Sequence, residues 1–177
     1  ERIQTHFNYK IWRHILNSAG IERFPQYHFD MVRLGIGLHG ISATHANLQP
    51  VSSFKTYISS IRNVPEGQSI GYGRKSYTTR SSRIAVIPVG YADGLNRHLS
   101  NRVGNVFIKG KRVPIIGNIC MDTCMIDVTD TNAAIGDEVE IFGKHILVTE
   151  LSEQLGTIPY EILTGISHRV KRVYYKE

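Results

Sequence analysis

The first segment whose residue types could bind an anion is Asn17-Ser18-Ala19-Gly20. It follows a compact apolar run over residues 12–16, so we expect the Ser18 hydroxyl where a short strand gives way to a turn. A hydroxyl at such a turn, beside free backbone N–H groups, can bind a phosphate. Alternatively, Ser18 caps a helix, which is a common role of serine. The motif by itself favours the cap.

A second candidate anion site lies in the segment Arg33-Leu34-Gly35-Ile36-Gly37. An arginine buried in such an apolar run must find an acceptor, because an unpaired buried charge is very costly. The glycine at position 35 leaves the nearby backbone N–H groups open to an anion. The pattern is equally compatible with an ion pair inside the fold and with an anion site.

A tyrosine stands between two glycines in the segment Gly71-Tyr72-Gly73. The glycines allow a tight turn that exposes the ring. A tyrosine hydroxyl ordinarily has a pKa of about 10, so it is a poor base at neutral pH unless nearby cations lower that pKa. A surface aromatic in a glycine-rich turn is therefore the simpler interpretation.

Two later segments carry polar groups at the ends of apolar runs. The first, Pro88-Val89-Gly90-Tyr91-Ala92-Asp93-Gly94, follows a run typical of a buried strand and ends in a turn. The second is Ile119-Cys120-Met121-Asp122. Taken alone, Asp122 is compatible with a turn cap and Met121 with core filling.

The elements that must position these residues differ along the chain. Residues 1 to about 45 mix helical spacing with apolar runs over 12–16 and 31–41, which is typical of α/β structure. From about residue 47 the pattern is mostly β, with Lys109-Gly110-Lys111 as a hairpin turn. We expect strands within 51–61, 84–89, 106–108, 113–116, 125–128, 139–142, 146–148, 163–166 and 170–175. Residues 149–155 are expected to form a helix capped by Thr149. Many short strands at such intervals favour a barrel or sandwich.

Composition bounds the class of protein. The chain has 177 residues, 41% of them hydrophobic and 20% charged, which suits one globular core or one domain with part of another. It opens on polar residues typical of the middle of a helix, which suggests a piece of a longer chain. No apolar run approaches the roughly 20 residues that span a bilayer, and no signal-peptide pattern is found, so we expect a cytoplasmic protein. A net charge of +6 permits anionic partners without choosing among them.

The metal-binding and redox residue types form no recognisable motif. Cys120 and Cys124 have C-x-x-x-C spacing, which matches neither a redox pair nor a zinc pair. We expect both as reduced thiols. The eight histidines lack helix-metal spacing beside a carboxylate, so no metal site is expected.

Taken together, in their order and spacing, these segments resemble alanine racemases over essentially the whole chain. The matching stretches are Asn17-Ser18-Ala19, Phe29-Asp30-Met31-Val32-Arg33-Leu34-Gly35-Ile36, Gly71-Tyr72-Gly73, Pro88-Val89-Gly90-Tyr91-Ala92-Asp93-Gly94 and Gly117-Asn118-Ile119-Cys120-Met121-Asp122. The resemblance implies an enzyme with an N-terminal (β/α)₈ barrel that holds pyridoxal 5′-phosphate, followed by a C-terminal β domain. We therefore expect a mainly β fold. Residues 1–45 would be the end of that barrel, an α/β remnant, and residues 46–177 a β domain of β-barrel or Greek-key type.

The resemblance also implies a cofactor site. Ser18, Gly35 and Ile36 would contact the phosphate, in the loops after the last two barrel strands. His168 stands where many relatives have a phosphate-contacting tyrosine. Arg33 would donate to the pyridine nitrogen. Because a guanidinium stays protonated, that nitrogen would stay unprotonated and the ring would be a weaker electron sink.

The implied catalytic residue is Tyr72, which would exchange a proton with one face of the substrate Cα while the cofactor lysine serves the other. In the family this tyrosine comes from the other subunit of a head-to-tail homodimer. Tyr91, Met121 and Asp122 match positions at the substrate entrance, with the Met121 backbone N–H donating to the substrate carboxylate.

Some positions depart from the family pattern. The family's cofactor lysine lies near the start of the barrel, in a region this chain lacks. Asn118 replaces an arginine common in relatives, and His39 replaces a tyrosine.

Three functions are weighed on this basis. The leading one is a C-terminal fragment, inactive alone, of an enzyme that interconverts L- and D-alanine for peptidoglycan precursors. A serine or broad-specificity racemase is the second, because entrance residues tune size preference by only a few kcal/mol. The third is a non-catalytic basic module that binds nucleic acid. Such a module needs aromatics interleaved with cations, and residues 102–112 carry only Phe107. We therefore expect no nucleic-acid and no membrane partner.

Overall fold

The structure, a computed structural model, describes residues 3–44 and 47–175. It divides into two compact units, Glu1–Ser52 and Ser53–Glu177. Among the described residues, no helix has the length and apolar character that crossing a bilayer requires. The two units are described separately.

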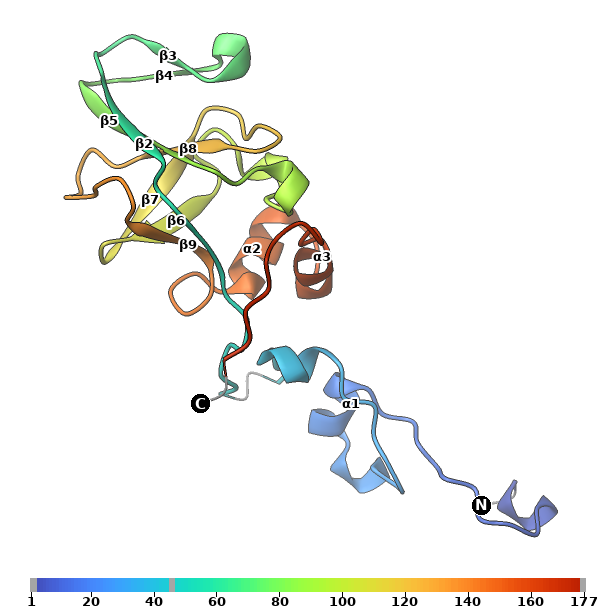
Figure 1. The fold of residues 1–177 in the computed structure, drawn as a ribbon. Coiled ribbons are helices and arrows are strands. Elements are labelled where there is room, and N and C mark those ends of the chain that lie inside the picture. The colour runs from blue at the N-terminus through green and yellow to red at the C-terminus, as the bar shows by residue number, and fades with distance from the viewer. Residues whose placement is uncertain (1–2, 45–46, 176–177) are drawn as a thin grey trace. The chain divides into compact units, whose positions relative to one another are not determined.

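The second unit is built on one antiparallel seven-stranded sheet (Figure 1). Its strand order is β1-β9-β6-β7-β8-β5-β2. The strands are β1 (Phe54–Tyr57), β2 (Ser60–Val64), β5 (Ser82–Ile87), β6 (Asn105–Ile108), β7 (Lys111–Ile116), β8 (Cys124–Asp127) and β9 (Glu138–Phe142). The predicted mainly β fold is therefore confirmed, and so is the hairpin between β6 and β7 at residues 109–110.

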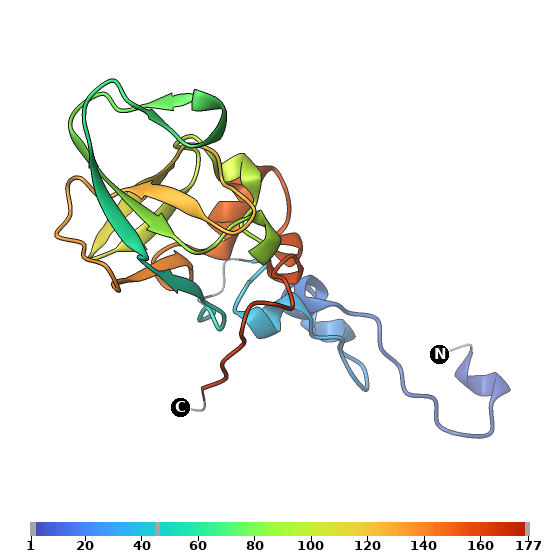
Figure 2. The same ribbon diagram turned by 45° about the horizontal axis from the view of Figure 1, so that its top comes forward.

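One segment of chain supplies both edges of the sheet and curls it into a barrel-like form (Figure 2). β1 pairs with β9, and β2, which follows after two residues, pairs with β5. At the junction, Ile58 N donates to Asp137 O at 3.0 Å and Ser59 N donates to Val86 O at 2.9 Å. The same segment thus pairs with both ends of the sheet, which leaves few unpaired edge groups.

The core lies inside this curved sheet. Side chains of β6 and β8 alternate between buried and partly exposed positions, as expected for strands with one face on the core. Isoleucines dominate, and Ile58, Ile87, Ile115 and Ile126 are at most 1% exposed. Burying each such side chain contributes roughly 1.5–3 kcal/mol.

Two helices pack beside each other at this core, α2 (Val148–Leu155) and α3 (Pro159–Thr164) (Figure 1). Four local predictions are wrong here. Residues 146–148 are not a strand, since Val148 begins α2. The cap of α2 is Leu147, without a side-chain bond, rather than Thr149. Residues 163–166 form the end of α3 and the turn that follows it, and residues 170–175 form no strand. The apolar residues of α2 recur at helical spacing. The β-branched residues just before and at its start are typical of a strand, and they led to the wrong prediction.

A two-stranded excursion, β3 (Ser69–Ile70) and β4 (Ser76–Tyr77), extends from the sheet and carries the short 3-10 helix η4 (Tyr72–Arg74) at its tip (Figure 1). Buried Thr78 fastens its base. The Thr78 hydroxyl donates to Pro65 O at 2.6 Å and accepts from Gln68 N at 3.1 Å. The excursion therefore starts from a fixed base.

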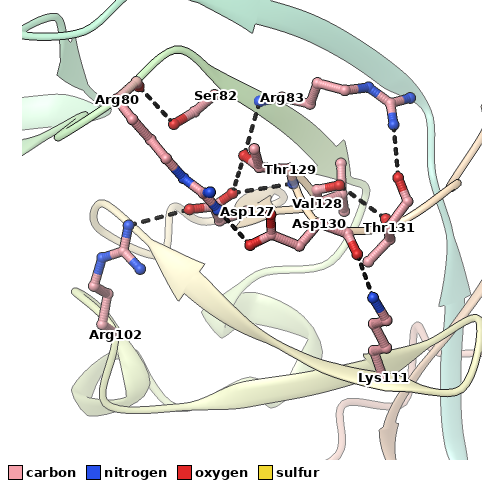
Figure 3. Close-up of polar contacts among 10 residues, drawn as sticks. All are labelled: Arg80, Ser82, Arg83, Arg102, Lys111, Asp127, Val128, Thr129, Asp130 and Thr131. Atoms are coloured by element: carbon pink, nitrogen blue, oxygen red, sulfur yellow. Dashed lines mark hydrogen bonds and ion pairs between the residues drawn. The ribbon is translucent and has the colours of Figure 1, made fainter.

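A polar cluster joins the end of β8 to its neighbours (Figure 3). Asp127 accepts from the Thr129 hydroxyl at 2.5 Å and from Arg102 Nη2 at 3.1 Å. Burial alone would raise the pKa of Asp127, but these hydrogen bonds outweigh it and hold the pKa below its usual value. Arg83 on β5 donates to the carbonyls of Thr131 and Ala133. The charged side chains of this cluster bond one another or nearby carbonyls of the same unit, so the cluster joins neighbouring strands of the sheet.

The first unit contains only short helices among its described residues: η1 (Gln4–His6), α1 (Ser18–Arg23), η2 (Pro25–Tyr27) and η3 (Ile36–His39). The strands expected within 12–16 and 31–41 do not form. The two runs still lie side by side, since Arg33 N donates to Leu16 O at 2.9 Å and Met31 N donates to Arg13 O at 3.3 Å. A parallel pair is normally stabilised by further strands beside it, and the described residues of this unit form no further strand.

Candidate functional site

The first candidate cluster surrounds the Ser18 hydroxyl. Ser18 is 5% exposed, and its Oγ accepts from Gly35 N at 2.9 Å and from Gly37 N at 3.2 Å. Asn17, and not Ser18, caps α1, because the Asn17 side chain accepts from Gly20 N at 3.0 Å. The capping interpretation of Ser18 is therefore wrong. A hydroxyl with its own proton to donate and a set of backbone N–H groups converge at one point.

Arg33 lies on the same segment, but it is not buried as the apolar run suggested. Its side chain is exposed, and Nη2 donates to Ile15 O at 3.0 Å. Its acceptor is a neutral carbonyl, so the guanidinium keeps a full charge and further N–H donors available to a ligand atom.

Tyr72 lies at the tip of the excursion and is 77% exposed. Gly71 and Gly73 have φ angles of 75° and 77°, in the left-handed region that favours glycine. The two glycines that flank Tyr72 therefore do what their type predicts: they bend the backbone so that the ring between them is exposed.

The segments carrying Tyr91 and Met121 form one surface. Tyr91 N donates to Cys120 O and Ala92 N donates to Met121 O, each at 3.0 Å. Gly90 makes this approach possible, because a Cβ there would lie 2.3 Å from the carbonyl oxygens of both Cys120 and Met121. The side chains of Tyr91 and Met121 are 46% and 53% exposed.

Arg169 joins this surface to the segment that carries His168. Arg169 Nε lies 2.7 Å from Asp93 Oδ1, and Arg169 Nη2 lies 2.7 Å from Asp122 Oδ1. Hydrogen bonds to Asp93 and then Asp122 raise the pKa of Arg169 above its ordinary value. Ser167 N also donates to Asp93 O at 3.1 Å. The exposed His168 is thereby fixed beside the surface formed by Tyr91, Met121 and Asp122.

Four of the predicted site residues thus come together in the second unit: Tyr91, Met121, Asp122 and His168. Ser18, Gly35, Ile36 and Arg33 come together in the first. Sequence reasoning gave no role to Asp93 or Arg169, although both lie in segments it singled out. The available signal was position: Asp93 lies two residues after Tyr91, and Arg169 directly follows His168.

The remaining titratable groups do not suggest a metal centre. Among residues 3–44 and 47–175, no group of three or more histidine, cysteine or acidic side chains is arranged to hold a metal. Both cysteines are free, and burial raises the pKa of Cys124 to about 12.

Two family descriptions match the chain. Residues 51–174 match the alanine racemase C-terminal domain, and residues 1–43 match the alanine racemase N-terminal domain. Among curated relatives, alanine racemase 2 of Caldanaerobacter subterraneus subsp. tengcongensis is 47% identical over 172 residues, covering 92% of this chain and 44% of the relative. Alanine racemase of Methanococcus maripaludis is 45% identical, covering 92% of this chain and 46% of the relative. The chain thus spans somewhat less than half the length of these relatives.

Solved structures agree with the sequence matches. Alanine racemase from Bartonella henselae, with covalently bound pyridoxal phosphate, superposes with a TM-score of 0.88 at 35% identity, over 98% of this chain and 49% of that one. Alanine racemase from Bacillus anthracis with bound L-Ala-P gives a TM-score of 0.85 at 35% identity, over 94% and 45%. The likeness covers both units.

Proposed function

Because this chain belongs to the alanine racemase family, we propose that it works as part of a pyridoxal-phosphate-dependent enzyme that interconverts L- and D-alanine. Residues 1–45 would be the end of the cofactor-binding barrel and residues 46–177 the C-terminal β domain. The observation that carries the proposal is the clustering of the family-matched residues at two points, one suited to a phosphate and one to an amino acid. The D-alanine produced would supply peptidoglycan precursors in the cytoplasm.

The residues around Ser18 fit the phosphate of the cofactor. A phosphate offers only acceptors at neutral pH, and the Ser18 hydroxyl has a proton to donate to it. The N–H groups of Gly35 and Gly37 donate to Ser18 Oγ and so hold that hydroxyl in place. We assign Ser18, Gly35 and Ile36 to the phosphate, with His168 as a further contact. Arg33 would donate to the pyridine nitrogen and keep it unprotonated. When bound, the cofactor supplies an electron sink for the charge left on Cα after proton removal.

Tyr72 would move the proton on one face of Cα. Its ring is 77% exposed at the tip of an excursion from the barrel, which suits delivery to the active site of a partner subunit in a head-to-tail homodimer. The opposite face needs a second group, which the resemblance assigns to a lysine early in the barrel. No residue of this chain corresponds to that lysine, so we expect the chain to be inactive alone.

Tyr91, Met121 and Asp122 would form the substrate end of the site. The Met121 N–H would donate to the alanine carboxylate. Asp122 is paired with Arg169, so its negative charge is balanced and repels an incoming carboxylate less. A serine or broad-specificity racemase is the alternative within the same fold, because an added hydroxyl is weakly rejected by an apolar site.

The test uses the full-length enzyme that contains this chain, wild type beside Tyr72→Phe. Removing the hydroxyl should leave cofactor absorbance unchanged and lower racemisation by roughly 10²–10⁴-fold. Wild-type turnover by Tyr72→Phe would remove Tyr72 from the mechanism. Comparing alanine with serine in the same assay decides the substrate, and measurable racemisation by the purified 177-residue chain would contradict its expected inactivity.

A further inference from the structure

A side-chain amide holds the backbone of the Tyr72 loop. Asn118 Nδ2 donates to the carbonyl oxygen of Tyr72 at 2.8 Å. Asn118 lies in the connection between β7 and β8, 46 residues further along the chain. The bond therefore ties the tip of the excursion to the barrel at the residue whose ring is proposed to act on the substrate.

Two further residues fix the orientation of this amide. Asn101 Nδ2 donates to Asn118 Oδ1 at 3.1 Å, and the Ser76 hydroxyl donates to Asn101 Oδ1 at 2.8 Å. A carbonyl can only accept, so Asn118 must present its NH₂ to Tyr72 and its oxygen to Asn101. Asn101 must then present its own NH₂ to Asn118, and its oxygen to a donor. The Ser76 hydroxyl supplies that donor, so every bond in the relay has one consistent direction.

The barrel side of the relay is rigid. Asn101 N donates to Gly117 O and Ile119 N donates to the Ser100 hydroxyl, each at 2.9 Å. Ser100 and Ile119 are 6% and 1% exposed. Two buried hydrogen bonds thus join the segments on either side of Asn101 and Asn118, so the two amides are held at a fixed separation.

The loop is anchored to the barrel at its two ends, where buried Ile70 packs with Ile84 and Ile116 and the Ser76 hydroxyl bonds Asn101. Residues 71–75 are all exposed. Arg74 Nε donates to Ser69 Oγ at 3.1 Å, which is a contact within the excursion and does not tie it to the barrel. Between these two ends, the hydrogen bond from Asn118 ties the Tyr72 carbonyl to the barrel.

We propose that Asn118, oriented by Asn101 and Ser76, is a positioning residue that holds Tyr72 in the geometry needed for proton transfer. The proposal rests on the proposed racemase function. A displacement of about 1 Å in a reacting group costs on the order of a hundredfold in rate. The relay thus acts on the rate of the chemical step more than on substrate or cofactor binding.

The decisive variant is Asn118→Asp in the full-length enzyme. Aspartate has the same size and still accepts from Asn101, but it cannot donate to the Tyr72 carbonyl. We expect kcat to fall by about 10- to 100-fold, with KM for alanine and cofactor absorbance nearly unchanged. Asn96→Asp is the matched control, because Asn96 acts as an acceptor for His98 N and an aspartate does the same.

Two measurements separate the relay from the proposed function. In the Tyr72→Phe background, Asn118→Asp should lower turnover no further, whereas an equal loss in both backgrounds overturns the proposal.

In the 177-residue chain, trypsin should cleave after Arg74 and Lys75 faster in Asn118→Asp than in wild type, at an unchanged Tm. Wild-type cleavage and wild-type kcat together overturn the proposal. If Tyr72→Phe turns over normally, the proposed function fails, and the cleavage rate still decides whether Asn118 holds the loop.

Asn101→Gly tests the relay at a residue that lies outside the excursion. Asn101 has a φ of 57°, which glycine adopts freely, so only the amide is lost. We expect kcat to fall and tryptic cleavage to become faster, as in Asn118→Asp, but both changes should be smaller. No change in either overturns the role of Asn101.

Discussion

Arg169 Nη2 lies 2.7 Å from Asp122 Oδ1, although the two residues come from separate loops of the barrel unit. The same guanidinium also bonds Asp93, whose carboxylate accepts from Gly90 N at 2.9 Å. A planar guanidinium with several N–H groups can serve two carboxylates at once. Arg169 therefore ties the segment of His168 to the Tyr91 and Met121 loops, which backbone hydrogen bonds already join to each other.

Replacing Arg169 by lysine should loosen the connection between the segment of His168 and these loops. An ammonium is a compact charge that satisfies one carboxylate at a time at this spacing. In the full-length enzyme we expect KM for alanine to rise by about tenfold, with a smaller change in kcat, because substrate-binding groups are loosened. Steady-state kinetics with Arg62→Lys as control measures this, since Arg62 is exposed on β2. An unchanged KM would show that the bridge does not shape the entrance.

Replacing Gly90 by alanine should disturb the same surface sterically. The added Cβ would meet two backbone carbonyls at 2.3 Å, and backbone cannot move aside as a flexible side chain can. We expect a loss of about 1–3 kcal/mol in the free energy of unfolding, measured by urea denaturation of the 177-residue chain. Gly67→Asn is the control, because no atom lies within 4 Å of its Cβ position and asparagine tolerates a positive φ. Equal losses in both variants would contradict the steric explanation.

Glu140 should make the stability of the barrel unit depend on pH in the acid range. Its carboxylate is 6% exposed and accepts from His145 N at 2.7 Å and Ile146 N at 3.2 Å. Burial alone would raise its pKa, but the hydrogen bonds from His145 and Ile146 outweigh burial and lower it. The folded-state pKa is then below the unfolded one. The resulting stability is present above the unfolded value of about 4.3 and is lost as pH falls through the folded value.

Glu140→Gln tests this dependence. The variant should be less stable than wild type at pH 7, and the difference should shrink as pH falls below about 4. Urea midpoints between pH 7 and pH 3 measure it. Glu153→Gln, exposed on α2, should follow the wild-type curve at all pH values. A constant gap between wild type and Glu140→Gln would show that Glu140 does not supply the dependence.

The strands of the barrel could be predicted because their pattern is local. The apolar run of β5 predicts a buried strand, and the Lys109–Gly110 pair predicts a hairpin turn, without reference to any distant residue. Helix α3 was missed because six residues beginning at Pro159 carry too short an apolar pattern to show a helical period. The strands expected in the first unit need neighbouring strands to pair with. The apolar pattern there was correctly recognised, but the predicted strands do not form.

Only those residues of the candidate site that match a motif of the resembling family could be predicted from the sequence. Residues such as Tyr72 and Ser18 match short motifs. The contacts that hold these residues match no motif. Arg169 and Asp93 are 76 residues apart in the sequence, and Asn118 and Tyr72 are 46 residues apart. No composition or periodicity in one sequence encodes such pairings, because they arise from how the barrel closes.

Cys124 should resist alkylation in the folded chain. Its side chain is fully buried on β8, and burial, with a smaller effect of Cys120, raises its pKa to about 12. Only the thiolate reacts, so at pH 8 roughly one Cys124 in ten thousand is reactive even when reagent can reach it. Cys120 is partly exposed. Mass spectrometry after iodoacetamide treatment should therefore find at most one label on the native chain, on Cys120, and two labels in urea. Two labels on the native chain would contradict the burial of Cys124 and reopen the C-x-x-x-C segment as a redox pair.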